Sequence, residues 1–175
     1  EGISDRIRSS LSKNLSSSVI YKFIESVFIN KPRQVKLFFI ITGLENDKDL
    51  LEFDELCVRL IKNRKLYSPG ASVVFSFMPL VLCQKTPLMF SPAPDSKKVY
   101  DIIFALIKKL NGFDKITARI SIDKKAYDIT SICESGGREL SCVLYDLAVN
   151  YSAVYYDGID DKTYNQFMAG VRKAG

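Results

Sequence analysis

The spacing of apolar residues along the chain predicts helices and strands that alternate. After Ser16, a suitable N-cap, apolar side chains recur every three or four positions, which is the spacing of one helix face. An almost continuous apolar run follows from Val35 to Ile41. Such a run is typical of a strand that is buried on both faces of a parallel sheet. A short helix is expected before these elements, with Ser4 or Asp5 as its cap.

The following segments repeat this alternation. A helix face is predicted from Phe53 to Ile61, and a second buried strand from Ala71 to Met78. Strand, helix and strand in this order form a βαβ unit with parallel strands. The segment from Pro79 to Pro94 holds four of the six prolines, so we expect a long ordered loop there. Loops of this length in compact domains are commonly functional.

The pattern changes after residue 94, and we expect an extension from there to the end. The alternation of apolar and polar residues from Ile116 to Ile122 predicts a strand with one wet face, which is either an edge of the sheet or an appendage to it. We therefore predict a parallel α/β unit over residues 1–94 and an α+β extension over residues 95–175. The extension is expected to contain helices at Val99–Leu110, Ala126–Cys133 and Leu140–Leu147, a strand at Val154–Tyr156, a turn at Asp157-Gly158 and a last helix from Asp160.

Composition and charge narrow the function only slightly. The chain has 175 residues, 47% of them hydrophobic and 26% charged, which suits one globular domain with a real core. Its net charge of +5 is scattered, and no RNA-binding motif accompanies it, so we do not expect a nucleic-acid partner. No apolar stretch is long enough for a membrane span and no secretory signal opens the chain, which favours a cytoplasmic protein without a membrane partner.

The chain is poor in residues that bind metals or act as general bases. It has no histidine, and none of its four cysteines forms a closely spaced pair with another. Self-contained zinc and iron–sulfur sites need such clusters, so we expect no metal ligand here. Nucleophile pairs that depend on histidine are also excluded. We assign no catalytic residue to the chain, and Cys57 is interpreted as a small core residue.

Three segments carry a pattern of another kind. The first runs from Glu1 to Ser16, and the second is the strand that ends at Thr42-Gly43 and is followed by acidic residues. The third runs from Val73 through Met78-Pro79 to Thr86-Pro87. In this order they resemble the carboxyl-terminal half of radical S-adenosylmethionine (SAM) barrels, in the cobalamin-domain-linked and methylthiotransferase-like branch. Ile3 and Lys85 depart from that branch, which usually has glycine and histidine at these positions.

The resemblance implies a fold and a parent activity. The fold would be half of a (βα) barrel over residues 1–94, with the extension packed on it. The parent enzyme would cleave SAM reductively to a 5′-deoxyadenosyl radical with a [4Fe–4S] cluster held by a CxxxCxxC motif, which this chain lacks. Cobalamin is a further possible cofactor. The abrupt start at Glu1 is interpreted as that of an excised fragment, whose partner is the missing amino-terminal half of the same protein.

The resemblance also implies a SAM site at the carboxyl ends of the strands. Hydrogen bonds to the ribose are assigned to Glu1 or Ser4, and the SAM carboxylate to Lys13. Backbone approach to the adenine is assigned to Gly43, and apolar packing to Ile41 and to Phe77 or Met78. Each of these positions also has a purely structural interpretation: a solvated terminus, a cation at a helix end, a turn glycine or ordinary core.

Two other interpretations remain open at this stage. In the first, the chain is a degenerate barrel that acts as a non-enzymatic scaffold. In the second, it is a generic doubly wound α/β domain with a ligand loop at Gly43–Asn46. The loop lacks the GxGxxG and P-loop patterns of nucleotide sites. A CxxxCxxC motif before Glu1 would favour the enzyme. A half barrel should also leave strand edges open, and we expect self-association through them.

Overall fold

The computed structural model describes residues 1–151 and 159–174, which form two compact units. The first contains residues 1–80 and 97–121, and the second contains residues 81–96 and those after 121. Residues 97–121 therefore belong with the first unit, whereas the sequence-based boundary at residue 94 assigns them to the extension. The predicted strand at Val154–Tyr156 and its Asp157-Gly158 turn lie outside the described residues.

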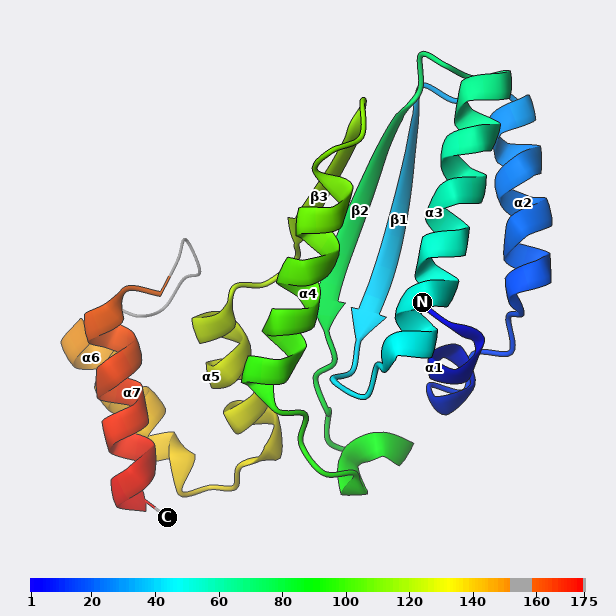
Figure 1. The fold of residues 1–175 in the computed structure, drawn as a ribbon. Coiled ribbons are helices and arrows are strands. Elements are labelled where there is room, and N and C mark those ends of the chain that lie inside the picture. Colours follow the sequence, from blue (N-terminus) through cyan, green and yellow to red (C-terminus); the bar gives the residue numbers. More distant parts are fainter. Residues whose placement is uncertain (152–158, 175) are drawn as a thin grey trace. The chain divides into compact units, whose positions relative to one another are not determined.

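The first unit is a parallel sheet with helices (Figure 1). Its strands lie in the order β1-β2-β3, and both neighbouring pairs are parallel. Val73 of β2 pairs with Val35 on one side and with Ile116 on the other. The predicted α/β class and the edge position of β3 are thus confirmed. Its elements are α1 (Asp5–Ser10), α2 (Ser17–Ile29), β1 (Gln34–Ile41), α3 (Asp47–Tyr67), β2 (Ser72–Pro79), α4 (Ser96–Leu110) and β3 (Ile116–Ile120).

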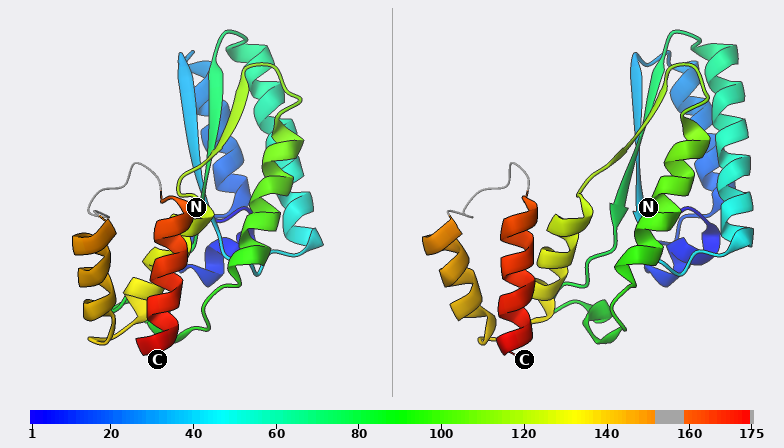
Figure 2. Two further views of the ribbon diagram at one scale, coloured as in Figure 1. Left: turned by 90° about the vertical axis from the view of Figure 1, so that its left-hand side faces the viewer. Right: turned by 60° about the vertical axis from the view of Figure 1, so that its left-hand side comes forward.

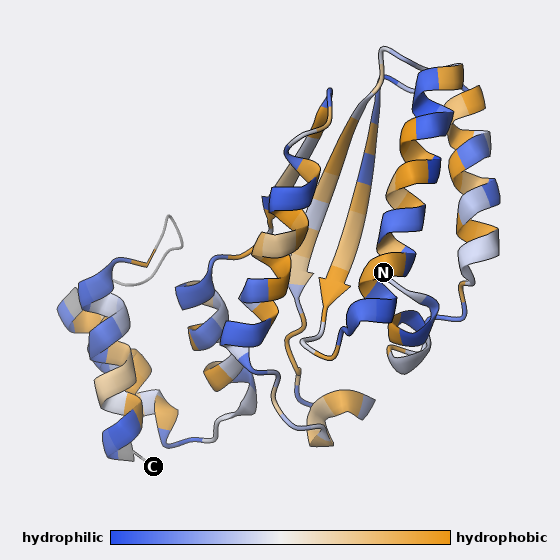
Figure 3. Cartoon of the chain, viewed as in Figure 1, coloured by the Kyte–Doolittle hydropathy of each residue, from blue (hydrophilic) through white to orange (hydrophobic). Residues whose placement is uncertain are grey.

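Helices α3 and α4 cover one face of the sheet, and the core of the unit lies between them and the strands (Figure 2). Every second side chain of β1 and β2 faces these helices, and Phe39, Phe75 and Phe77 are almost completely buried there. Phe39 stacks on Phe75 with ring centroids 5.9 Å apart, and Phe53 of α3 meets Phe39 edge-on at 5.4 Å. Figure 3 shows the apolar residues of β1 and β2 as orange bands, which belong to both faces of the sheet.

The opposite face of the sheet, which we call the open face, carries exposed side chains. The prediction that both faces of the strands are buried is therefore wrong for β1, and it holds only in part for β2, where Ser76 on this face is 2% exposed. Phe38 and Met78 point to this face and are 59% and 49% exposed. Ile40 and Val74 are half-buried. The apolar run did not predict this exposure, because α3 and α4, which follow β1 and β2, both lie on the same side of the sheet (Figure 2).

Side-chain caps fix where the helices of the first unit begin. Ser4 and Ser16 accept hydrogen bonds from the backbone N–H of the third residue of α1 and of α2, Ile7 and Val19, as predicted for N-caps. Asn46 begins α3 with a capping box, in which the Asp49 side chain accepts from the Asn46 backbone at 2.8 Å.

The second unit is helical in its described part. Helix α6 packs on α7, where Gly170 lies so close to Val143 that an added Cβ would be 2.7 Å from its Cγ1 atom. Phe167 of α7 is fully buried. The proline-rich segment contains a single 3₁₀ turn, which agrees with the predicted loop. The elements are this turn (Pro87–Phe90), α5 (Lys124–Ser135), α6 (Leu140–Tyr151) and α7 (Asp161–Ala174). Within residues 1–151 and 159–174, no helix combines the length and apolar character needed to cross a membrane.

Candidate functional site

Three segments of the first unit meet at the carboxyl ends of its strands. The register places Ile40 of β1 opposite Met78 of β2, so the segments that follow the two strands leave the sheet at the same end of the strands. Glu1 joins them: its terminal ammonium group donates to Phe38 O, and its carbonyl accepts from Ile40 N–H at 3.0 Å. We call the region formed by residues 1–4, 42–45 and 78–79 the carboxyl-end site. Ligands of parallel α/β folds bind at such edges.

The turn after β1 presents a buried carboxylate. Gly43 has a φ of 78°, in the left-handed region that favours glycine. The Thr42 N–H and hydroxyl both donate to Glu45 Oε1, at 2.7 and 3.0 Å. Glu45 is only 7% exposed, and its Oε2 atom has no hydrogen-bond partner among the described residues. The turn therefore offers a buried acceptor at the strand end, which a donor from a ligand can satisfy.

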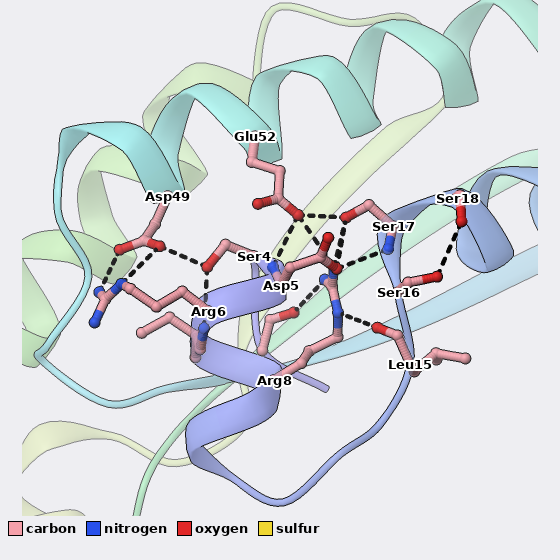
Figure 4. Close-up of polar contacts among 12 residues, drawn as sticks. Ser4, Asp5, Arg6, Arg8, Leu15, Ser16, Ser17, Ser18, Asp49 and Glu52 are labelled. Carbon is pink, nitrogen blue, oxygen red and sulfur yellow. Dashed lines mark hydrogen bonds and ion pairs between the residues drawn. The ribbon is translucent and has the colours of Figure 1, made fainter.

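Asp49 at the start of α3 links the amino-terminal segment to this turn (Figure 4). Ser4 Oγ donates to Asp49 Oδ1 at 2.6 Å, and Arg6 binds both carboxylate oxygens through Nε and Nη2. Arg6 also donates to the Leu44 carbonyl at 2.6 Å. Burial by itself raises the pKa of Asp49, but the hydrogen bonds from Arg6, Ser4 and the Asn46 backbone outweigh it and leave the pKa below its usual value.

Arg8 is the centre of a second polar cluster next to the first. Its side chain is 2% exposed, and its guanidinium donates to the carbonyls of Leu15 and Gly2 at 2.7 and 3.0 Å. Nη2 donates to Asp5, Ser17 and Glu52 (Figure 4). One planar group with five N–H donors thus joins α1, the loop before α2 and the first turns of α3. These contacts hold the amino-terminal side of the carboxyl-end site in place.

The structure brings some of the sequence-predicted SAM residues together and separates others. Glu1, Gly43 and Met78 lie at the same strand ends. Ile41 and Phe77 are fully buried on the helix-covered face, whereas Met78 is on the open face, so these three do not line one surface. The alternative of ordinary core describes Ile41 and Phe77.

The two polar side chains predicted to bind SAM, Ser4 and Lys13, also differ in their surroundings. Ser4 is buried, caps α1 and donates to Asp49, so its hydroxyl already has partners. Lys13 is exposed in the turn after α1, where its N–H donates to Arg8 O. Sequence reasoning missed Glu45, Arg6 and Arg8. Glu45 binds Thr42 within one tight turn, whose geometry the sequence pattern did not predict. Arg6 and Arg8 bind Asp49 and Glu52, more than forty residues further along the chain.

The described cysteines do not form a metal site. All four are free, and among residues 1–151 and 159–174 no group of three or more His, Cys, Asp or Glu residues is arranged to hold a metal ion. Cys57 is buried, and desolvation, together with the charge of Asp54, raises the pKa of its thiol to about 12. A [4Fe–4S] cluster therefore does not fit the donors of the described chain.

Comparisons with known proteins reveal no relative. No protein-family model, no curated protein and no solved structure matches the chain. Its function must therefore be inferred from the topology, exposure and hydrogen bonding of the described residues.

Proposed function

We propose that this chain is the carboxyl-terminal half of a radical SAM (βα) barrel and contributes part of its SAM-binding surface. The observation that carries this proposal is the pairing of Glu1 with β1. Its terminal ammonium group donates to Phe38 O, and its carbonyl accepts from Ile40 N–H; these two residues of β1 lie on either side of Phe39. This is the pattern of neighbouring parallel strands. Glu1 thus has the position of the last residue of a further strand, which would precede α2 and lie beside β1.

The order of the elements supports a barrel. A strand at Glu1, followed by β1, β2 and β3, gives parallel neighbours in sequence order, and α3 and α4 lie on one face. Successive βα units arranged in this way build (βα) barrels. Helix α2 supports the same arrangement. Its Ile24 and Phe28 are buried, whereas Val19 and Phe23, on another side of the helix, are 51% and 68% exposed and available to a neighbouring element.

The open face of the sheet has the composition of a barrel interior that holds a ligand. One row across the three strands consists of Phe38, Ser76 and Arg119, and the row before it begins with the exposed Lys36. A face packed under helices, as in doubly wound sheets, would be mainly apolar. Exposed cations among half-buried apolar side chains favour a lumen with a polar ligand instead.

The carboxyl-end site fits SAM in part. The unpaired Glu45 Oε2 atom can accept from the amino group or a ribose hydroxyl of SAM, Gly43 lets a ligand approach the backbone, and the exposed Met78 can pack on the adenine. The cluster that supplies the electron for SAM cleavage needs three cysteines, which we assign to the other half of the parent. Cobalamin, if the parent uses it, is likewise assigned to another domain.

The first experiment measures SAM binding to the 175-residue chain by NMR. We expect saturable shifts of the Gly43 and Glu45 amides, and a weaker affinity for Glu45→Gln. The control variant Asp47→Asn, which removes an exposed carboxylate nearby, should bind normally. The second experiment measures iron, sulfide and 5′-deoxyadenosine on the natural-length protein, reconstituted without oxygen and supplied with SAM and a reductant. An iron–sulfur cluster together with SAM cleavage would support the proposed radical SAM activity of the natural-length protein.

A non-enzymatic scaffold derived from such a barrel is the second candidate. It is favoured by the mutual hydrogen bonds of Ser4, Arg6 and Asp49, which leave these polar side chains engaged with each other. Binding of SAM to neither the chain nor the natural-length protein, together with the absence of a cluster, would support this candidate and refute the enzyme. Self-association through the open edge of β1 would be expected in both cases and is measured separately by sedimentation.

A further inference from the structure

A groove of about 590 Å³ lies between α3 and the carboxyl end of α4, on the helical side of the first unit. Cys57 and Leu110 are buried and form its floor together with the half-buried Ile61. Val58 and Phe113 form its walls and are 66% and 42% exposed. Its volume falls within the range of small-molecule sites, roughly 300–1,000 Å³. None of its lining residues belongs to the carboxyl-end site.

The rim of this groove is cationic. Lys62 and Lys65 of α3 and Lys109 of α4 border it, with Asp54 as the single acid among the lining residues. Lys109 pairs with Asp54. Lys62 and Lys65 are exposed, and within the described ranges neither forms an ion pair. Lys65 is in the last turn of α3, where it complements the helix dipole, but Lys62 lies a turn earlier. An apolar floor with two unpaired cations at its edge is complementary to an anion that carries an apolar chain.

The dimensions of the groove favour a small molecule over a peptide helix. The α3 wall runs from Asp54 to Lys65, about 16 Å at 1.5 Å per residue, but the opposite wall comes only from Lys109 to Phe113. A docked helix needs anchor positions along several turns on both sides. We propose that this groove binds a small amphipathic anion, with its aliphatic chain on Cys57, Ile61 and Leu110 and its carboxylate between Lys62 and Lys65. This site is independent of the proposed SAM function.

The test compares three ligands with the same ten-carbon chain and different head groups. Decanoate and decyltrimethylammonium are titrated into the full chain below their micelle concentrations, and decanol below its solubility limit, and methyl NMR shifts are followed. We expect decanoate to saturate with shifts at Val58, Ile61 and Leu110, to bind several-fold more tightly than decanol, and to bind most tightly of the three. Equal affinities for all three, no saturation, or shifts confined to Ile40 and Met78 on the open face would overturn the proposal.

Two sets of variants separate the roles of charge and cavity. Lys62→Ala with Lys65→Ala should weaken decanoate binding about five- to tenfold and leave decanol binding unchanged, since two partly exposed ion pairs are lost. The control, Lys48→Ala with Lys108→Ala, removes the same charge from α3 and α4 outside the groove and should change neither affinity. Val58→Trp fills the groove from an exposed position and should abolish binding. Equal effects of both lysine pairs would refute the assignment of the head group.

Discussion

Replacing Arg8 with alanine is expected to destabilise the first unit strongly. The guanidinium is the common partner of two backbone carbonyls, one hydroxyl and the carboxylates of Asp5 and Glu52, and its side chain is only 2% exposed. Removing one partner of a buried ion pair costs about 3–5 kcal/mol. Asp5 and Glu52 are 54% and 27% exposed, so water can hydrate them again once Arg8 is lost. We therefore expect the lower end, a loss of about 3 kcal/mol in the free energy of unfolding.

Urea unfolding at neutral pH measures this loss, and amide exchange assigns it to the first unit. The Ser17 amide, which donates to Asp5 at 2.7 Å, should exchange faster in Arg8→Ala. Arg8→Lys keeps the charge but not the planar fork, so it should recover only part of the stability. Arg33→Ala removes an exposed arginine and serves as the control, with a change within about 0.5 kcal/mol. A similarly small change for Arg8→Ala would refute the role given to the buried cluster.

Three further results are expected. The pKa of Asp49 is lowered from 3.8 in the folded protein, so its ionised form stabilises the fold fully above about pH 4. This stabilisation is lost as the pH falls through the lower folded-state pKa. The free energy of unfolding should therefore fall less on acidification in Asp49→Asn than in the unchanged protein. Peptide mapping after treatment with a thiol reagent should find the exposed Cys142 labelled and Cys57, buried with a pKa of about 12, unlabelled until the protein unfolds. Gly43→Ala should cost roughly 1–2 kcal/mol at its positive φ, measured by urea unfolding, whereas Gly112→Ala, where a Cβ meets open space, should not.

Local patterns were sufficient to predict most helices and strands of the first unit. Ser4 and Ser16 are predictable as caps, because a hydroxyl before an apolar helical stripe is a local signal. The apolar run of β1 predicts a strand correctly, but it does not predict that one face of this strand is exposed. Phe38 and Ile40 are apolar and nevertheless lie on the open side, so composition could not show which face the helices cover.

The site and the division into units depend on contacts between distant residues. Asp49 lies in the first turn of α3, where acidic residues complement the helix dipole, yet it also binds Ser4 and Arg6, more than forty residues earlier. Residues 97–121 join the first unit because β3 pairs with β2 across the proline-rich segment. Neither contact has a period or a spacing in the sequence, so neither could be found by pattern alone.

The discontinuous first unit has a consequence for folding during synthesis. The chain leaves this unit after Leu80 and returns to it at Lys97, so β2 is complete long before β3 can pair with it. At about 5–20 residues per second, the ribosome needs roughly 2–8 s to translate from Pro79 to Ile120. During this interval the β2 edge is open to chaperones and to other nascent chains. Translational pauses that hold β2 outside the ribosome before β3 has emerged should therefore lower the yield of folded protein, and pauses after both strands have emerged should not.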